Sequence, residues 1–273
     1  TLCRLLRIPN TLIIDNWDNL NSKSIFSESP TGLGVWGESM ENDARQIHNM
    51  RPKVVSHIGS ARFRPNENQQ LPIEKEFLLF AGSGKPVLNE LNAVIKVREF
   101  MDNCELSHLN LIYRPHPISG MDLRAIASQL QLQHGIQIDP SFEGLLKDNF
   151  YQPGPLHYLE SLCKYARIVI APQSTIIVES LSLGTPVIAL NWSEVTPGLQ
   201  PLEEYTHFEE LYDSCGFFAP RNYDELKTVI EKVLSLNFGY NLVPFILPTF
   251  SNSYSERVLK LISETYLSFE EEN

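Results

Sequence analysis

The sequence has no apolar run near the roughly 18 residues that a membrane-spanning helix needs, and no segment reads as a signal peptide. Basic residues are in the minority, with 22 Lys and Arg against 33 Asp and Glu, and the formal net charge is −11. This balance counts against broad nucleic-acid binding, which requires a basic face. No internal repeat is present either. We therefore expect a globular protein with no nucleic-acid partner, located in the cytoplasm, and leave peripheral association with the inner membrane open.

Cysteine is also scarce. The four residues Cys3, Cys104, Cys163 and Cys215 lie far apart and form no CxxC pair. Such spacing is typical of free thiols in a reducing compartment. The seven histidines show no ligand-like spacing, so we expect no metal site and no cofactor.

What the 273 residues do contain is an alternation of strand-like and helix-like segments along almost the whole chain. This alternation predicts an α/β fold with a parallel sheet. Strands are expected at 11–15, 53–58, 77–81, 109–114, 136–139, 167–171, 186–190 and 216–220. Helices are expected at 38–50, 87–103, 121–132, 156–166, 175–183, 222–236 and 253–269.

A polar, proline-bearing stretch after Gly59 reads as a linker between domains. We accordingly assign residues 1–65 to the end of an amino-terminal α/β domain and residues 66–252 to a Rossmann-like domain. Residues 253–273 are expected to form a helix that packs back across the domains. Because the chain starts in what reads as the end of a helix, upstream sequence is also expected.

The best functional signal begins with residues 109–117, LNLIYRPHP, a buried strand that ends in a basic elbow. The planar guanidinium of Arg114 suits a phosphate, and the imidazole of His116 can donate to the same group. Pro115 and Pro117 restrict the backbone on both sides of His116. The alternative is a strand-end turn whose polar side chains are solvated.

A second strand, RIVIAP at 167–172, opens onto Ser174 and Thr175 and then a helix. The amino end of a helix presents unpaired N–H groups and the positive end of its dipole, which favours anions. The alternative is that Ser174 or Thr175 only caps the helix. Because open α/β sheets bind ligands at the carboxyl ends of their strands, the two strand ends together predict a phosphate-bearing nucleotide.

Two further features support this prediction. Glu179 stands in an otherwise apolar helical run, where an unpartnered buried charge is costly, and ribose hydroxyls would give it partners. A solvated helix face is the alternative. Gly82, Ser83 and Gly84 follow the strand 77–81, where small residues let a ligand approach the backbone, although the same residues make ordinary turns.

The amino-terminal segment offers one candidate for a general base. Asp18, with Asp15 behind it, lies in the polar run Asp15–Asn19 directly after a strand. An Asx-rich turn with a packed Trp is the competing interpretation. We read His57 as a core or strand-end histidine.

These residues resemble the nucleotide-binding half of GT-B glycosyltransferases over about 77–236. The run from Glu179 to Ile188, ESLSLGTPVI, is similar to the E-x-L-x-x-G-x-P-V-I pattern of that fold and of its relative, the UDP-sugar 2-epimerase. The pair His116–Pro117 followed by Ser174–Thr175 is similar to the HP and S/T motifs of bacterial sialyltransferases, β-Kdo transferases and CDP-glycerol polymer transferases.

The resemblance implies roles for individual residues. His116, Ser174 and Thr175 would contact the donor phosphates, and Glu179 would hold the ribose. Residues 1–65 would be the end of the acceptor-side domain, most of which this chain does not contain. The acidic motif of sialyltransferases has no match at the corresponding place, so the resemblance does not identify a CMP-sugar donor.

The sequence therefore predicts a metal-independent glycosyltransferase that moves a sugar from a nucleotide donor to a carbohydrate acceptor in surface polysaccharide or glycan synthesis. Its site would comprise Asp18 and His116 as catalytic residues, with donor-binding residues Gly82, Ser83, Gly84, Arg114, His116, Ser174, Thr175 and Glu179. Two alternatives stay open: an enzyme like the UDP-sugar 2-epimerases, and a non-catalytic nucleotide-binding module. The nucleobase, the sugar and the oligomeric state are not specified.

Overall fold

The protein forms two compact units. The computed structural model describes residues 2–23, 25–62, 71, 73, 76–82, 90–104, 106–116, 123–142, 157–196 and 201–270. Unit 1 comprises Thr1–Arg62 and Val243–Asn273, and unit 2 comprises Phe63–Leu242. Residues 243–252, assigned above to the Rossmann-like domain, thus belong to unit 1.

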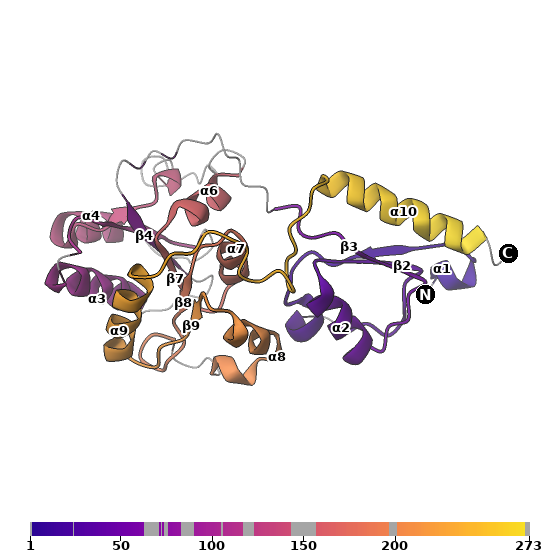
Figure 1. Cartoon of the computed structure of the whole chain (residues 1–273), viewed down its shortest axis with the longest axis horizontal. Helices are drawn as coiled ribbons and strands as arrows, with labels where there is room; N and C mark the ends of the chain where they lie inside the picture. The colour runs from indigo at the N-terminus through magenta and orange to yellow at the C-terminus, as the bar shows by residue number, and fades with distance from the viewer. Residues whose placement is uncertain are drawn as a thin grey trace. The chain divides into compact units, whose positions relative to one another are not determined.

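Unit 2 is built on a six-stranded sheet in which all neighbouring strands are parallel (Figure 1). The strands are β4 (Phe77–Ala81), β5 (Asn110–Arg114), β6 (Gln137–Ile138), β7 (Ile168–Ala171), β8 (Val187–Ala189) and β9 (Phe217–Phe218). Their order in the sheet is β6-β5-β4-β7-β8-β9. The chain thus builds outward from β4 in one direction, then returns to β7 and builds outward in the other. This is the order of a doubly wound Rossmann fold, whose switch point lies between β4 and β7.

Helices cover both faces of this sheet. Their bounds are α3 (Glu90–Asn103), α4 (Leu123–His134), α6 (Tyr158–Tyr165), α7 (Ile176–Ser182), α8 (Thr206–Glu209) and α9 (Tyr223–Leu234). Figure 1 shows α3, α4 and α9 on one side of the strands and α6 and α7 on the other. Buried Phe80, Tyr113 and Ile170 belong to the same apolar cluster as Val94 and Val97 of α3. Since strands covered on both faces are apolar throughout, FLLFA and IVIA read as continuous hydrophobic runs.

Unit 1 contains a smaller parallel sheet, in the order β1-β2-β3. Its elements are α1 (Leu2–Leu5), β1 (Thr11–Ile13), β2 (Gly32–Val35), α2 (Glu38–Gln46), β3 (Val54–His57) and α10 (Tyr254–Glu270). Figure 1 shows α10 and α2 on opposite sides of these strands. The carboxy-terminal helix packs on the sheet of its own unit, and Arg257 Nε donates to the carbonyl of Ile58 at 2.9 Å.

The strand β2 of unit 1 is missed by the sequence pattern. Its segment GLGV contains two glycines, which are depleted in strands and read as a loop. The structure gives the reason for them, because α10 lies directly on β2. A Cβ at Gly32 would overlap the hydroxyl of Thr265, and one at Gly34 would come within 2.8 Å of a methyl group of Leu261.

The expectation of an α/β fold with parallel sheets is confirmed. In the part of the chain that the structure describes, no helix has the length and apolar character needed to cross a membrane.

Candidate functional site

The two predicted phosphate-binding segments lie on the same edge of the large sheet. Phe80 of β4 is level with Ile170 of β7, and Ala81 is level with Arg114 of β5. Adjacent strands are about 4.8 Å apart, so β5 and β7 lie about 10 Å from each other on either side of β4. The residues that follow β5 and β7 therefore flank Gly82, which follows β4, at the switch point where doubly wound sheets bind ligands.

Gly82 is tied to β5 and cannot carry a larger side chain. Its N–H donates to the carbonyl of Arg114 at 2.8 Å. A Cβ on Gly82 would overlap Oε1 of Glu90, and it would lie 3.3 Å from the backbone nitrogen of His116. The backbone therefore comes close to a buried carboxylate here, and only glycine allows this approach. Ser83, Gly84 and Pro117 lie outside the described residues.

The carboxylate next to Gly82 belongs to a buried pair that the sequence analysis did not identify. Glu90 begins α3, is 2% exposed, and accepts a 2.5 Å hydrogen bond from the hydroxyl of Tyr113 on β5. Burial, together with the charge of Glu90 and this hydrogen bond, raises the pKa of Tyr113 far above its ordinary value. Tyr113 is thus a fixed donor that holds Glu90 beside Gly82.

Arg114 faces a second buried carboxylate, Asp139, which directly follows β6. The Arg114 guanidinium pairs with Asp139 Oδ2, donates to Ser141 Oγ at 3.0 Å and lies over the ring of Phe142. The other Asp139 oxygen accepts from the hydroxyl of Tyr158 at 2.7 Å. Much of the donor capacity of Arg114 is therefore used within the protein, and a part of its role is to fix the end of β5.

His116 is half-buried two residues beyond β5. Burial lowers the pKa of His116 below its ordinary value of 6.5, and the positive charge of Arg114 lowers it further. A lowered pKa leaves the imidazole neutral at pH 7, so that it can donate one N–H and accept at the other nitrogen. An arriving phosphate would favour the protonated form.

On the other side of Gly82, α7 points its amino end toward the same edge. Thr175 has helical backbone angles and makes no capping hydrogen bond through its hydroxyl, so the interpretation of Thr175 as a simple cap is not supported. Ser174 and Thr175 are both half-buried, with their carbonyls accepting from the N–H groups of Ile177 and Glu179. The Thr175 hydroxyl is thus not used to begin the helix.

Glu179 is 6% exposed, which excludes a solvated helix face. Burial raises the pKa of the neighbouring Cys163 thiol to about 12, and the charge of Glu179 contributes to the same shift. Glu179, the acidic residue that the sequence places in this helix, is therefore buried in the protein, about one turn after the start of α7.

A hydrogen bond extends the site toward β8. Gln173, directly before Ser174, donates from Nε2 to Asn191 Oδ1 at 3.2 Å. Asn191 follows β8 and also accepts from the hydroxyl of Thr196 at 3.4 Å. The ends of β7 and β8 are thus joined by side chains at the same edge.

The residues proposed from the amino-terminal segment belong to unit 1. Asp18 is bound within its own turn, by Lys23 Nζ at 2.8 Å and by Ser22 Oγ at 3.2 Å. Asp15 is exposed, and the adjacent Trp17 is buried, as in a packed Asx-rich turn. His57, at the end of β3, contacts Glu41 Oε2 at 2.9 Å and is a strand-end histidine as expected. Among the described residues no group of three His, Cys, Asp or Glu side chains could hold a metal ion.

The comparisons with known proteins identify the fold. No protein-family description and no curated protein sequence matches the chain. Solved structures do. The chain is similar to a putative UDP-N-acetylglucosamine 2-epimerase from Listeria monocytogenes (TM-score 0.63, 12% identity, 97% of this chain and 69% of that one). It is also similar to S. aureus MnaA, solved with UDP (TM-score 0.62, 15% identity, 98% and 70%).

A third similar structure is the UDP-GlcNAc 2-epimerase of Methanocaldococcus jannaschii with UDP-GlcNAc and UDP (TM-score 0.56, 16% identity, 86% of this chain). The chain spans 61% of the length of that enzyme. This chain has the GT-B fold. The GT-B fold is what the sequence resemblance implies, and at identities of 12–16% the similarity shows the fold alone.

Proposed function

We propose that this chain is a nucleotide-sugar enzyme that binds the diphosphate of a UDP-sugar at the switch point between β4 and β7. The observation that carries the proposal is the strand order, which brings Gly82, His116 and Ser174 to one edge of the sheet. His116 and the hydroxyls of Ser174 and Thr175 would bind the phosphate oxygens. Glu179 would accept from the ribose hydroxyls. Arg114 would add positive charge behind His116 while its pairing with Asp139 keeps it in place.

For the reaction, epimerisation at the sugar C2 is the first candidate. It is supported by two solved UDP-GlcNAc 2-epimerases, one of them putative, that share this fold at TM-scores of 0.56 and 0.63. Epimerisation removes the proton at C2 and returns a proton to the opposite face. Substrate and product therefore have the same composition, and no acceptor is required.

Glycosyl transfer, which the sequence analysis puts first, is the second candidate. One observation favours it: the buried carboxylates Glu90 and Asp139 at this edge are hydrogen-bonded by Tyr113 and by Arg114 and Tyr158. These carboxylates are therefore engaged rather than aimed at a substrate proton. In transfer, the bond from the anomeric carbon to the phosphate breaks and UDP leaves with the electron pair. A bond from that carbon to an acceptor oxygen forms, and the acceptor proton passes to a base.

Proton NMR of the purified protein with UDP-N-acetylglucosamine and no acceptor separates the two reactions. Epimerisation predicts a new anomeric signal from a second UDP-sugar, with no release of UDP. Transfer predicts no change until a carbohydrate acceptor is added, and then release of UDP. His116→Ala should lower either activity. His108→Ala should lower neither, because His108 is exposed and lies just before the amino end of β5. Absence of turnover under both conditions, and with other nucleotide sugars, would oppose both candidates.

A further inference from the structure

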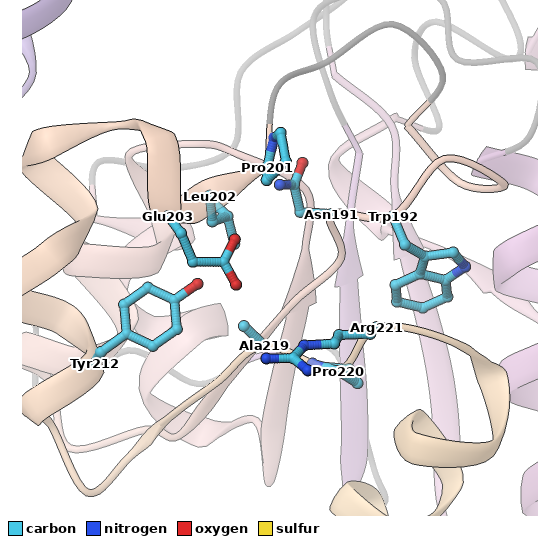
Figure 2. A pocket seen from close by; sticks show the side chains of 9 residues that line it. All are labelled: Asn191, Trp192, Pro201, Leu202, Glu203, Tyr212, Ala219, Pro220 and Arg221. Carbon is cyan, nitrogen blue, oxygen red and sulfur yellow. The ribbon is translucent and has the colours of Figure 1, made fainter.

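A pocket of about 230 Å³ lies at the carboxyl ends of β8 and β9, at the same edge of the sheet as the candidate nucleotide site (Figure 2). Asn191 lines this pocket and is the residue that accepts the hydrogen bond from Gln173, beside Ser174. Pockets for drug-sized ligands begin at roughly 300 Å³. The pocket is smaller than that, so its size suits a single small ring rather than a complete nucleotide.

One wall of the pocket carries an arginine. Figure 2 shows the Arg221 side chain extending among the other lining residues. Its backbone is fixed, because the N–H of Arg221 donates to Glu225 Oε2 at 2.9 Å while the N–H of Glu225 donates to Asn222 Oδ1 at 2.9 Å. These two hydrogen bonds lie at the start of α9 and set the backbone position of Arg221. Within the described part of the chain its guanidinium has no carboxylate within ion-pair distance, so it can receive an external anion.

The opposite wall carries a tyrosine hydroxyl and a carboxylate acceptor. The Tyr212 hydroxyl and the Glu203 carboxylate are turned toward each other (Figure 2). Burial raises the pKa of Tyr212 to about 12, and the charge of Glu203 and a hydrogen bond to it act in the same direction. Tyr212 is therefore a neutral donor to Glu203, and the remaining acceptor capacity of this carboxylate suits ligand hydroxyl groups.

The rest of the lining is apolar and rigid. Pro201, Leu202, Ala219 and Pro220 contribute carbon surfaces. Trp192 is 9% exposed and its ring is held edge-on against Tyr223, with ring centroids 5.2 Å apart. Figure 2 shows the indole nitrogen turned away from the other labelled side chains, so the indole presents carbon to the pocket. A ring with one apolar face and hydroxyls on its rim matches this lining.

We propose that this pocket binds a sugar ring that bears one anionic group, a carboxylate or a phosphate. Arg221 binds the anionic group through paired, charge-assisted N–H donors. Glu203 accepts from the ring hydroxyls, and the apolar lining covers the carbon face of the ring. Asn191 lines the pocket and is hydrogen-bonded to Gln173, which directly precedes Ser174. The sugar therefore lies beside the candidate nucleotide site. The proposal extends the proposed function by a second ligand, and it is tested without nucleotide.

Saturation-transfer NMR with three probes tests it: methyl β-D-glucuronide, glucose 6-phosphate and the uncharged methyl β-D-glucoside. At least one acidic probe should bind about tenfold or more tightly than the glucoside, since a hydrogen bond to a charged group discriminates by at least that factor. The acidic probe that binds more tightly identifies the anionic group. Arg221→Gln should weaken its binding about tenfold without a change in melting temperature. Arg167→Gln, at the amino end of β7, is the matched control and should bind as the wild type does.

Three results would overturn the proposal: no binding of any probe, equal binding of the glucoside, or unchanged binding in Arg221→Gln. A parallel UDP titration separates this inference from the proposed function. Protein that binds UDP but none of the sugars contradicts only the acidic-sugar pocket. Protein that binds an acidic sugar but no UDP contradicts only the nucleotide site.

Discussion

The carboxylate of Glu90 lies directly against Gly82, at the point where β4 ends and the candidate nucleotide site begins. Glu90 is almost fully buried and is held by a hydrogen bond from the equally buried Tyr113. The backbone at Gly82 is thus in contact with a fixed polar pair inside the protein. Glycine at position 82 is a condition of this arrangement, because any Cβ would displace the carboxylate.

Substitution of Gly82 by Ala should therefore destabilise the protein by about 1–3 kcal/mol, the usual cost of an added group in a packed site. It should also weaken UDP binding, since the backbone nitrogen of His116 lies 3.3 Å from the added carbon. Urea unfolding measures the first effect and calorimetry the second. Gly239→Ala is the control, because a Cβ there meets nothing within 4 Å. Equal unfolding free energies for the two variants would contradict the proposed support.

The buried pair of Arg114 and Asp139 leads to a second prediction. Asp139 is fully buried, so Asp139→Ala leaves the Arg114 charge without its partner and should cost about 3–5 kcal/mol of stability. Tyr158→Phe removes only one hydrogen bond to the same carboxylate and should cost about 1–3 kcal/mol. Thermal or urea unfolding of both variants checks this order. If Tyr158→Phe were less stable than Asp139→Ala, the ion pair with Arg114 would not be the main stabilising interaction of Asp139.

The pKa of His116 should lie below 6.5 in the free protein, because of its burial and the charge of Arg114. The folded state then binds fewer protons at this site than the unfolded state does. The contribution of His116 to stability is complete above pH 6.5 and decreases as the pH falls through the range between 6.5 and the lowered value. UDP should raise this pKa, since an anion favours imidazolium, and by linkage UDP should bind more tightly as the pH falls from the pKa of the complex to that of the free protein.

An NMR titration of the histidine ring protons, with the His116 signals identified by their loss in His116→Ala, measures both values. A pKa at or above 6.5 in the free protein would contradict the described surroundings of the ring. A pKa that does not change with saturating UDP would mean that no phosphate lies near it.

The cysteines give a prediction about reactivity. Burial raises the pKa of Cys163 to about 12, whereas Cys215 is exposed. The thiolate is the reactive form, so iodoacetamide at mildly alkaline pH should label Cys215 and leave Cys163 unmodified in the folded protein. Both should be labelled in urea, and mass spectrometry of the peptides reads the result. If Cys163 were labelled under native conditions as fast as Cys215, Cys163 would be exposed, which would contradict its burial in the structure.

Much of the large sheet follows from the sequence. The strands 109–114 and 167–171 are short apolar runs bounded by polar elbows, and the structure has β5 and β7 at those places. The rule that ligands bind at the carboxyl ends of parallel strands then brings Arg114, His116 and Ser174 to one edge. The order of the strands, which decides that Gly82 lies between them, depends on sheet pairing and is not visible in any local pattern.

What the sequence could not provide are the contacts between distant segments. The sequence predicts the strand 136–139, which ends at Asp139. It does not show that β6 lies beside β5, and the pairing of Asp139 with Arg114 depends on that. Glu90 reads as an ordinary acidic residue at a helix start, and its burial follows only from the position of Tyr113. The strand β2 was missed because Gly32 and Gly34 are needed by α10, more than 200 residues later in the sequence.

The central claim is that a nucleoside diphosphate binds between the end of β5 and the start of α7. Isothermal titration of UDP into the wild type, His116→Ala and the control His108→Ala tests it most directly. The account predicts that wild type and His108→Ala bind UDP with equal affinity and that His116→Ala binds it about tenfold more weakly. Absence of UDP binding to the wild type, or equal affinity in His116→Ala, would contradict it.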